Sequence, residues 1–220
     1  MILGTNHPKY LEKLNRITGK FNGAYYYALE IESNIIPRVK TNRNWNTIKI
    51  DNTCLDHSIV FVHRNVDLEK TYNYLKDYED LVLVCSNYET QKFMQRYGKA
   101  IFLPLSVDVD YVKQFKTEKT LDACYAGNMW RFKRQDISKY VPKETHCLTN
   151  IPREELLREV AKYKTCYAIG RTAIEAKILG CEIKVCDSRY LDTSFWEIID
   201  NKEASKILQR QLDEIDFVGE

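Results

Sequence analysis

The sequence contains no run of apolar residues approaching the 18 or so that a membrane-spanning helix needs, and its first residues lack the apolar region of a secretory signal peptide. Its seven cysteines are odd in number and include no C-x-x-C pair, which argues against both a disulfide framework and a zinc ribbon. Most of them lie inside apolar segments, where a free thiol behaves as a small hydrophobic side chain. These absences predict a cytoplasmic protein with reduced thiols.

The sequence also lacks a G-x-G-x-x-G fingerprint and a complete P-loop motif, so neither a dinucleotide-binding nor an ATP-hydrolysing site is indicated. The formal net charge is only +2, and basic and acidic residues are spread over both halves of the chain. Nucleic-acid-binding proteins usually concentrate basic residues on one face, so this pattern weighs weakly against a nucleic-acid partner. A length of 220 residues, 44% of them hydrophobic, suits one large or two small globular domains.

Short apolar segments alternate with helical segments along most of the chain. Such alternation is typical of α/β proteins with parallel sheets, in which ligands gather at the carboxyl ends of the strands. The expected strands are 1–4, 47–50, 58–62, 81–85, 100–103, 121–126, 145–148, 166–169 and 182–186. The expected helices are 8–17, 24–32 (where three tyrosines also allow a strand), a tyrosine-rich segment ending near 78, 88–97, a segment ending at 140, 153–163, 173–179 and 201–212.

Residues 165–187 read as strand, turn, helix, turn and strand. The first apolar run stops at Gly170, and Arg171 and Thr172 lead into a helix that ends at Gly180, where a left-handed residue is favoured. A helix N-terminus behind a glycine turn offers free backbone N–H groups and the positive end of a dipole. This turn is therefore a candidate anion site, suited to a diphosphate.

Glu175 lies one turn into that helix, and two interpretations of it remain open. Its carboxylate could accept a hydrogen bond from a ribose hydroxyl, in which case the carboxylate would be solvated in the empty cleft. It could instead form an ordinary surface ion pair with Arg171, four residues earlier on the helix.

A second candidate anion site follows the strand expected at 121–126. Gly127 ends this strand and opens a loop that carries Asn128, Arg131 and Arg134. The glycine lets the backbone approach a phosphate, and guanidinium groups can grip phosphates in bidentate fashion. The alternative is a solvated basic turn that packs over the two aromatic residues of the same loop.

His63 is the candidate general base, because it directly follows the strand expected at 58–62, at an edge where a cleft should open. The alternative is a hydrogen-bonded structural histidine. The pair Asp108 and Asp110 matches an Asp-x-Asp metal motif. We interpret that pair as part of a linker, because it does not stand at a strand-end turn, and expect no metal site.

The segment GRTAIEAKILGCEIKVCD, residues 170–187, resembles the donor-binding block of GT-B-type glycosyltransferases, and most closely that of the short spore-maturation and phage glycosyltransferase-like proteins. The strand ending at Gly127 and the segment from Leu103 to Tyr111 are similar to other parts of that family. The resemblance implies two Rossmann-like halves facing across a cleft. Residues 1–107 would form the acceptor side, and residues 108–220 the donor side, with the C-terminal helix able to pack back on the first half.

The resemblance further implies transfer of a sugar from a UDP- or GDP-sugar to an unknown hydroxyl acceptor, without metal or cofactor. Glu175 would hold the donor's ribose, while Arg131, Arg134, Arg171 and helix N-termini would stabilise the departing diphosphate. Tyr167 stands where many retaining members carry a second Glu, and the acceptor half is short. These departures leave two other functions open: a non-catalytic nucleotide- or nucleotide-sugar-binding protein, and glycosylation of modified bases in viral DNA.

Overall fold

The computed structural model describes residues 59–62, 69, 73, 76–77, 82–86, 88–96, 99–127, 137–188 and 190–214. The chain forms two compact units, which we call unit 1 (residues 1–104 and 201–220) and unit 2 (residues 105–200). The division follows Pro104, whereas the sequence predicts a boundary after residue 107. The sequence assigns the tail to the second domain, with the C-terminal helix able to pack back on the first, and residues 201–220 belong to unit 1. The predictions for residues 1–58, and that for His63, lie outside the described residues.

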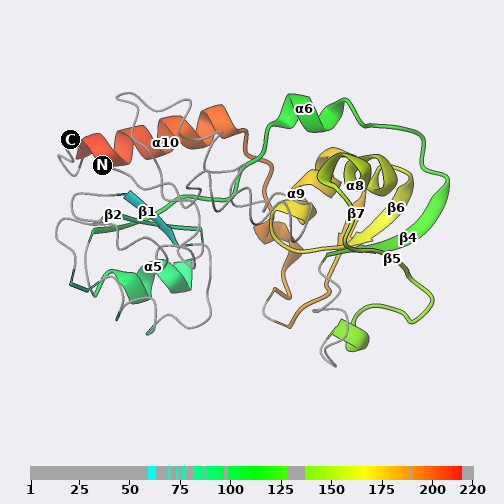
Figure 1. Cartoon of the computed structure of the whole chain (residues 1–220), viewed down its shortest axis with the longest axis horizontal. Coiled ribbons are helices and arrows are strands. Elements are labelled where there is room, and N and C mark those ends of the chain that lie inside the picture. The colour runs from blue at the N-terminus through cyan, green and yellow to red at the C-terminus, as the bar shows by residue number, and fades with distance from the viewer. Residues whose placement is uncertain are drawn as a thin grey trace, which may run out of the picture. The chain divides into compact units, whose positions relative to one another are not determined.

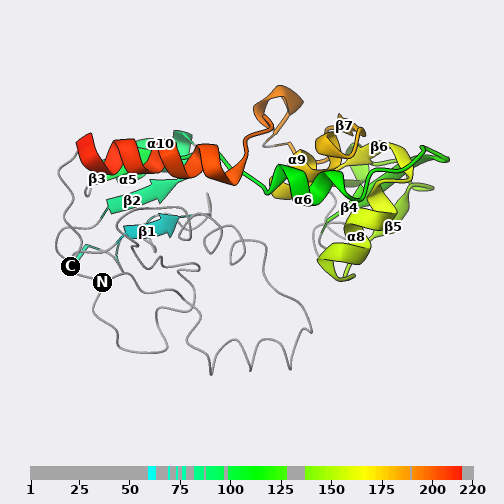
Figure 2. The same cartoon turned by 90° about the horizontal axis from the view of Figure 1, so that it is seen from above.

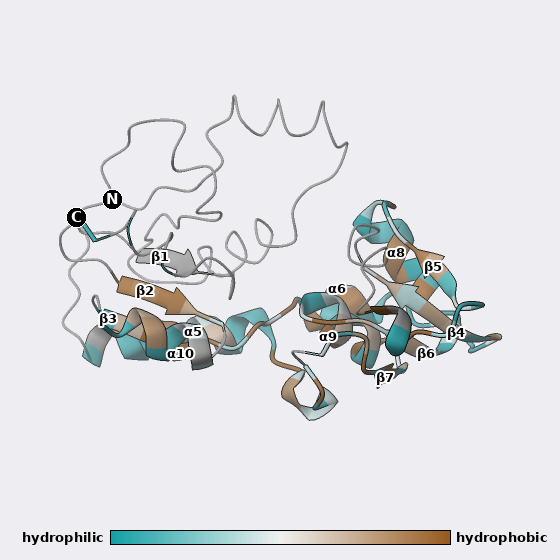
Figure 3. Ribbon diagram, turned by 90° about the horizontal axis from the view of Figure 1, so that it is seen from below, coloured by the Kyte–Doolittle hydropathy of each residue, from teal (hydrophilic) through white to brown (hydrophobic). Residues whose placement is uncertain are grey.

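Unit 1 contains a parallel sheet in the order β1-β2-β3, formed by β1 (Ile59–Val62), β2 (Val82–Cys85) and β3 (Lys99–Phe102) (Figure 1). The central strand β2 is buried at every residue, as its apolar sequence VLVC requires, and Figure 3 colours it as hydrophobic. Helix α5 (Tyr88–Met94) is the crossover from β2 to β3. Helix α10 (Asn201–Glu214) belongs to the same unit and buries Ala204, Leu208 and Leu212 on one face, at helical spacing.

Unit 2 contains the second parallel sheet, in the order β5-β4-β6-β7 (Figures 1 and 2). Its strands are β4 (Leu121–Ala126), β5 (His146–Leu148), β6 (Tyr163–Tyr167) and β7 (Glu182–Lys184). Its helices are α6 (Val109–Lys113), η1 (Ile137–Lys139), α8 (Arg153–Val160), α9 (Arg171–Ile178) and η2 (Thr193–Phe195). Two separate parallel sheets confirm the predicted α/β class.

The strand order of unit 2 fixes where a ligand crevice opens. From β4 the chain passes to β5 on one side, whereas β6 and β7 lie on the other side of β4. Connections that leave neighbouring strands in opposite directions form a crevice at the carboxyl ends of those strands. The crevice of unit 2 therefore lies after β4 and β6, where the sequence places Gly127 and Gly170.

The two faces of this sheet are covered by different elements. Cys124 on β4 and Cys166 on β6 share a buried cluster with residues of α8 and α9. Tyr125 belongs to a second buried cluster, with Ile137 of η1 and Val141. Because successive strand side chains point to opposite faces, α8 and α9 cover one face and the η1 segment covers the other.

The sequence misplaced the junction between α8 and β6. The helix predicted over 153–163 ends at Val160, and the strand predicted from Cys166 already begins at Tyr163. The carbonyl of Lys162 accepts hydrogen bonds from the N–H groups of Thr120 and Leu121, at 2.9 and 3.0 Å. These bonds place the chain beside β4 in the sheet before the apolar run that starts at Cys166.

Helix α6 was also missed, because the sequence treats residues 103–111 as a connecting segment. Asp108 is its N-cap, and the Asp108 carboxylate accepts a hydrogen bond from the backbone N–H of Tyr111 at 2.8 Å. The side chain of Asp110 is 88% exposed and lies 3.8 Å from Lys113. The first carboxylate of the Asp-x-Asp pair thus has a structural role.

The end of α9 confirms the prediction for Gly180, which has a φ of 87°. The N–H groups of Gly180 and Cys181 donate to the carbonyls of Lys177 and Ala176, both at 2.9 Å, which is the Schellman pattern. This stop directs the chain back into β7. None of the helices in the described part of the chain is long and apolar enough to cross a membrane.

Candidate functional site in unit 2

A cavity of about 190 Å³ opens at the crevice predicted by the strand order. Its walls come from the carboxyl end of β4, the loop between β6 and α9, and the segment after β7. The lining residues are Tyr125, Ala126, Gly127, Ile137, Ile169, Thr172, Cys186 and Asp187. The cavity therefore brings together the two glycine-bearing turns that the sequence singled out independently.

Gly127 is required by a close contact. A Cβ atom at this position would lie 2.6 Å from the Tyr125 hydroxyl, which is too close for any side chain unless the phenol moves. The glycine therefore leaves room for the Tyr125 phenol, which lines the same cavity.

Gly170 is the N-cap of α9 and has a conformation available essentially to glycine alone, with φ 63° and ψ −143°. Its carbonyl accepts hydrogen bonds from the N–H groups of Ala173 and Ile174, at 3.0 and 3.3 Å. As a glycine it has no side chain with which to cap the first turn of the helix. Thr172 of that turn lines the cavity, so the positive end of the α9 dipole is directed at this site.

Glu175 does not lie in an open cleft. The residue is only 4% exposed, so the expectation that its carboxylate is solvated is wrong. Its Oε1 atom accepts a hydrogen bond from Arg171 Nε at 3.2 Å, which confirms the predicted pair but shows it to be buried rather than on the surface. The same Oε1 atom lies 3.0 Å from Arg153 Nε and 2.9 Å from Arg153 Nη2.

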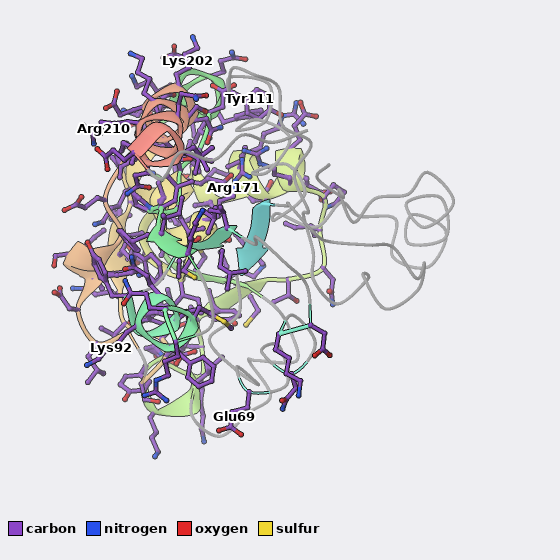
Figure 4. The ribbon with its side chains drawn as sticks, turned by 90° about the vertical axis from the view of Figure 1, so that its left-hand side faces the viewer. Glu69, Lys92, Tyr111, Arg171, Lys202 and Arg210 are labelled. Atoms are coloured by element: carbon purple, nitrogen blue, oxygen red, sulfur yellow. The ribbon has the colours of Figure 1, made fainter. Side chains whose placement is uncertain are left out.

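Arg153 is the partner that sequence reasoning missed. It is the first residue of α8, and its guanidinium lies over the ring of Tyr111 of α6, 5.3 Å from the ring centroid. Figure 4 labels Tyr111 and Arg171 among the side chains of this region. Burial and the Glu154 carboxylate raise the pKa of Tyr111, so its phenol stays neutral beneath the arginine. Helices α6, α8 and α9 thus contribute to one charged cluster.

The hydrogen bonds to Glu175 are all on one oxygen. Within the described part of the chain, each donor reaches Oε1 and none reaches Oε2. Two arginines therefore fix the orientation of the carboxylate and leave its second oxygen with remaining capacity to accept.

The other residues predicted for the site divide into two groups. Gly127 and Thr172 line the cavity, and Gly170 is the N-cap of the helix beside it. Asn128, Arg131, Arg134 and His63 lie outside the described residues. Asp187 also lines the cavity but was not predicted as a site residue, although it directly follows the strand predicted at 182–186; β7 itself ends at Lys184.

Metal-binding groups among the described residues and comparisons with known proteins do not narrow the function further. Within the described residues, no group of three or more His, Cys, Asp or Glu side chains is placed to hold a metal ion. No family model matches the sequence, and no curated protein and no solved structure matches it either.

Proposed function

We propose that unit 2 binds a nucleoside-diphosphate sugar and that the protein is a glycosyltransferase acting on a hydroxyl acceptor without a metal. The observation that carries the proposal is the cavity at the strand-order reversal, between Gly127 and the first turn of α9. In open parallel sheets this is the position at which nucleotide ligands bind. The resemblance of residues 170–187 to a donor-binding block supports the same site.

The diphosphate would lie against the first turn of α9. Gly170 leaves the helix without a side-chain cap, and Gly127 lines the opposite wall of the cavity. Backbone N–H groups and the helix dipole attract an anion here, and the Thr172 hydroxyl can donate to a phosphate oxygen. These groups supply positive potential where charge develops on the departing diphosphate, and Arg171 adds a full charge.

The ribose would be held by Glu175. Arg153 and Arg171 fix its Oε1 atom, which orients Oε2 before any ligand arrives. A preorganised acceptor loses little side-chain entropy when a ribose hydroxyl donates to it. Burial of Glu175 is consistent with this role because one carboxylate oxygen is enough to accept a hydrogen bond from a ribose hydroxyl.

A non-catalytic nucleotide-binding protein is the second candidate, and the residue at the end of β6 favours it. The position of a second acid in many retaining enzymes is occupied here by Tyr167, at the end of β6. Both functions predict nucleotide binding, and only the first predicts release of a free diphosphate.

A thermal-shift screen with UDP, GDP, ADP and CDP, each with and without an attached sugar, tests binding. A ligand at 100 times its Kd should add about 2.7 kcal/mol to stability. Release of the diphosphate in the presence of candidate acceptors then separates an enzyme from a binding protein. Failure of every nucleoside diphosphate to stabilise the protein would contradict both functions.

Glu175→Gln is expected to weaken nucleoside-diphosphate binding by about 10- to 150-fold, because a hydrogen bond to a charged acceptor contributes roughly 1.5–3 kcal/mol. The matched control is Glu154→Gln, which removes the same charge from an exposed pair with Arg158. Calorimetric titration at a temperature where all three proteins are folded measures the difference. Equal affinities of Glu175→Gln and the wild type would show that this carboxylate does not contact the ligand.

A further inference from the structure

We infer that Tyr111 positions the ribose-binding carboxylate: its ring holds Arg153, Arg153 fixes Glu175, and the site therefore selects nucleotides that carry ribose hydroxyl groups. This inference rests on the proposed function, in which Glu175 accepts a hydrogen bond from the ribose of a nucleoside diphosphate. It adds the class of nucleotide that binds and a residue, remote from the ligand, on which the selection depends. Three features of the structure carry it: the contact of Arg153 with Glu175, the ring beneath Arg153, and the contacts that fix that ring.

The contact of Arg153 with Glu175 is made to one oxygen only. Arginine often binds a carboxylate through two parallel hydrogen bonds, one to each oxygen. Here Nε and Nη2 of Arg153 lie 3.0 and 2.9 Å from the same atom, Glu175 Oε1. The Nε atom of Arg171 lies 3.2 Å from that oxygen as well. Within the described part of the chain, Oε1 thus takes all of these donors, and Oε2 is the oxygen that a ligand can use.

A carboxylate held in this way distinguishes a ribose from a sugar without hydroxyl groups. The 2′ and 3′ hydroxyls of a ribose are neighbours, and a single carboxylate oxygen has two sites at which it accepts hydrogen bonds. A 2′,3′-dideoxyribose offers no donor, so Oε2 of Glu175 would lose its partner when such a ligand binds. The side chain of Glu175 is only 5% exposed, so water replaces that partner poorly. Sites that bind a ligand hydroxyl in this manner reject the analogue that lacks it.

The ring of Tyr111 keeps Arg153 in the orientation that this selection requires. The guanidinium carbon of Arg153 lies 5.3 Å from the centroid of the Tyr111 ring, where the face of the ring attracts a cation. The side chain of Arg153 is 22% exposed, so part of it borders on water. Without the ring, the guanidinium could turn toward solvent and release Oε1. Glu175 would then lose the constraint that directs Oε2 toward the ligand.

Tyr111 is itself fixed by its backbone and by its ring. Its backbone N–H donates to the Asp108 carboxylate at 2.8 Å, in the first turn of α6. Its ring meets the ring of Phe115 edge-on, with the centroids 5.3 Å apart and the planes at 70°. Helix α6 also packs against α9, which carries Glu175. The ring is therefore a rigid support and not a mobile surface side chain.

Calorimetric titration with UDP and 2′,3′-dideoxy-UDP, and with GDP and 2′,3′-dideoxy-GDP, tests the inference in two variants. Tyr111→Leu removes the ring, and Arg153→Lys keeps the charge but loses the planar guanidinium. The wild type should bind the ribonucleotide at least about 10-fold more tightly than its dideoxy analogue. Each variant should reduce that ratio to about 3-fold or less, while its affinity for the dideoxy analogue stays within about 2-fold of the wild type.

Two conservative variants serve as matched controls. Tyr111→Phe keeps the ring and should restore the wild-type ratio. Arg158→Lys removes the guanidinium of a second arginine on α8, which lies 5.4 Å from the centroid of the Phe115 ring and pairs with Glu154 rather than Glu175. It should also keep the wild-type ratio. Melting curves of all five proteins set a titration temperature at which each is folded.

The outcomes separate this inference from the proposed function. If UDP or GDP binds but Tyr111→Leu and Arg153→Lys keep the wild-type ratio, the inference is wrong and the proposed function stands. If both variants weaken the ribonucleotide and the dideoxy analogue equally, Tyr111 supports only the fold, and the inference is again wrong. If the wild type does not distinguish the two ligands, Glu175 does not select the ribose. If no nucleoside diphosphate binds, the inference and the proposed function are both overturned.

Discussion

Replacement of Glu175 by alanine is expected to lower the free energy of unfolding of unit 2 by about 3 kcal/mol, because removal of one partner from a buried ion pair leaves uncompensated charge. The Glu175 side chain is 5% exposed, and those of Arg153 and Arg171 are 22% and 12% exposed. Both arginine side chains remain partly exposed to water, so the loss of unfolding free energy should lie at the lower end of the range for buried ion pairs. Urea denaturation followed by tryptophan fluorescence, to which the buried Trp196 contributes, measures it.

Glu154→Ala is the matched control for this loss. Glu154 also pairs with an arginine of α8, Arg158, but the two side chains are 56% and 60% exposed and lie 3.7 Å apart. An exposed pair of this kind contributes about 0.5 kcal/mol or less. Similar losses in the two variants would mean that the Glu175 cluster is no more than a surface ion pair.

Raising the pH from 9 to 12 is expected to destabilise the fold, and the thiol of Cys85 alone should account for about 4 kcal/mol. Burial on β2 raises the pKa of Cys85 from its ordinary value of 9.0 to about 12. The unfolded chain therefore loses this proton near pH 9, while the native state keeps it to about pH 12. The stabilisation is fully present below pH 9 and is lost as the pH rises through that window.

Unit 2 should respond in the same direction. The hydrogen bond with Cys124 and burial raise the pKa of Cys166, and burial raises that of Cys181 despite the nearby Lys119. The free energy of unfolding, measured by denaturant titration at pH 8, 9 and 10, should fall more steeply in the wild type than in Cys85→Ala or Cys166→Ala. Identical slopes in all three proteins would show that these thiols titrate normally in the native state.

The sequence predicted the elements of unit 2 that local pattern controls. Strand β4 has the predicted bounds, and Gly180 ends α9 as a left-handed residue. Both follow from short-range chemistry: a short apolar segment that stops at a glycine favours a strand, and glycine adopts a positive φ at little cost. The sequence placed Gly127 and Gly170 at the carboxyl ends of strands, but the strand order that makes a crevice there is known only from the structure.

The features that the sequence did not predict depend on contacts between residues far apart in the chain, or on elements too short to show a pattern. Arg153 reaches Glu175 from another helix, 22 positions earlier in the chain, and no local period connects the two. The same contact explains why Glu175 is buried although its helical position alone suggested solvent. Helix α6 was missed because its five residues carry too little periodicity, and only the cap at Asp108 marks its start.

Calorimetric titration of nucleoside diphosphates into the wild type, Thr172→Asp and Thr172→Asn tests most directly whether unit 2 binds a nucleotide at this cavity. Asp in the first turn of α9 complements the helix dipole and should leave stability unchanged or raise it by about 0.3–1 kcal/mol. The same carboxylate would repel a diphosphate, so affinity should fall at least about 10-fold, whereas the uncharged Thr172→Asn should bind nearly as the wild type does. Retention of full affinity in a folded Thr172→Asp variant, or no binding by the wild type, would contradict nucleotide binding at this site.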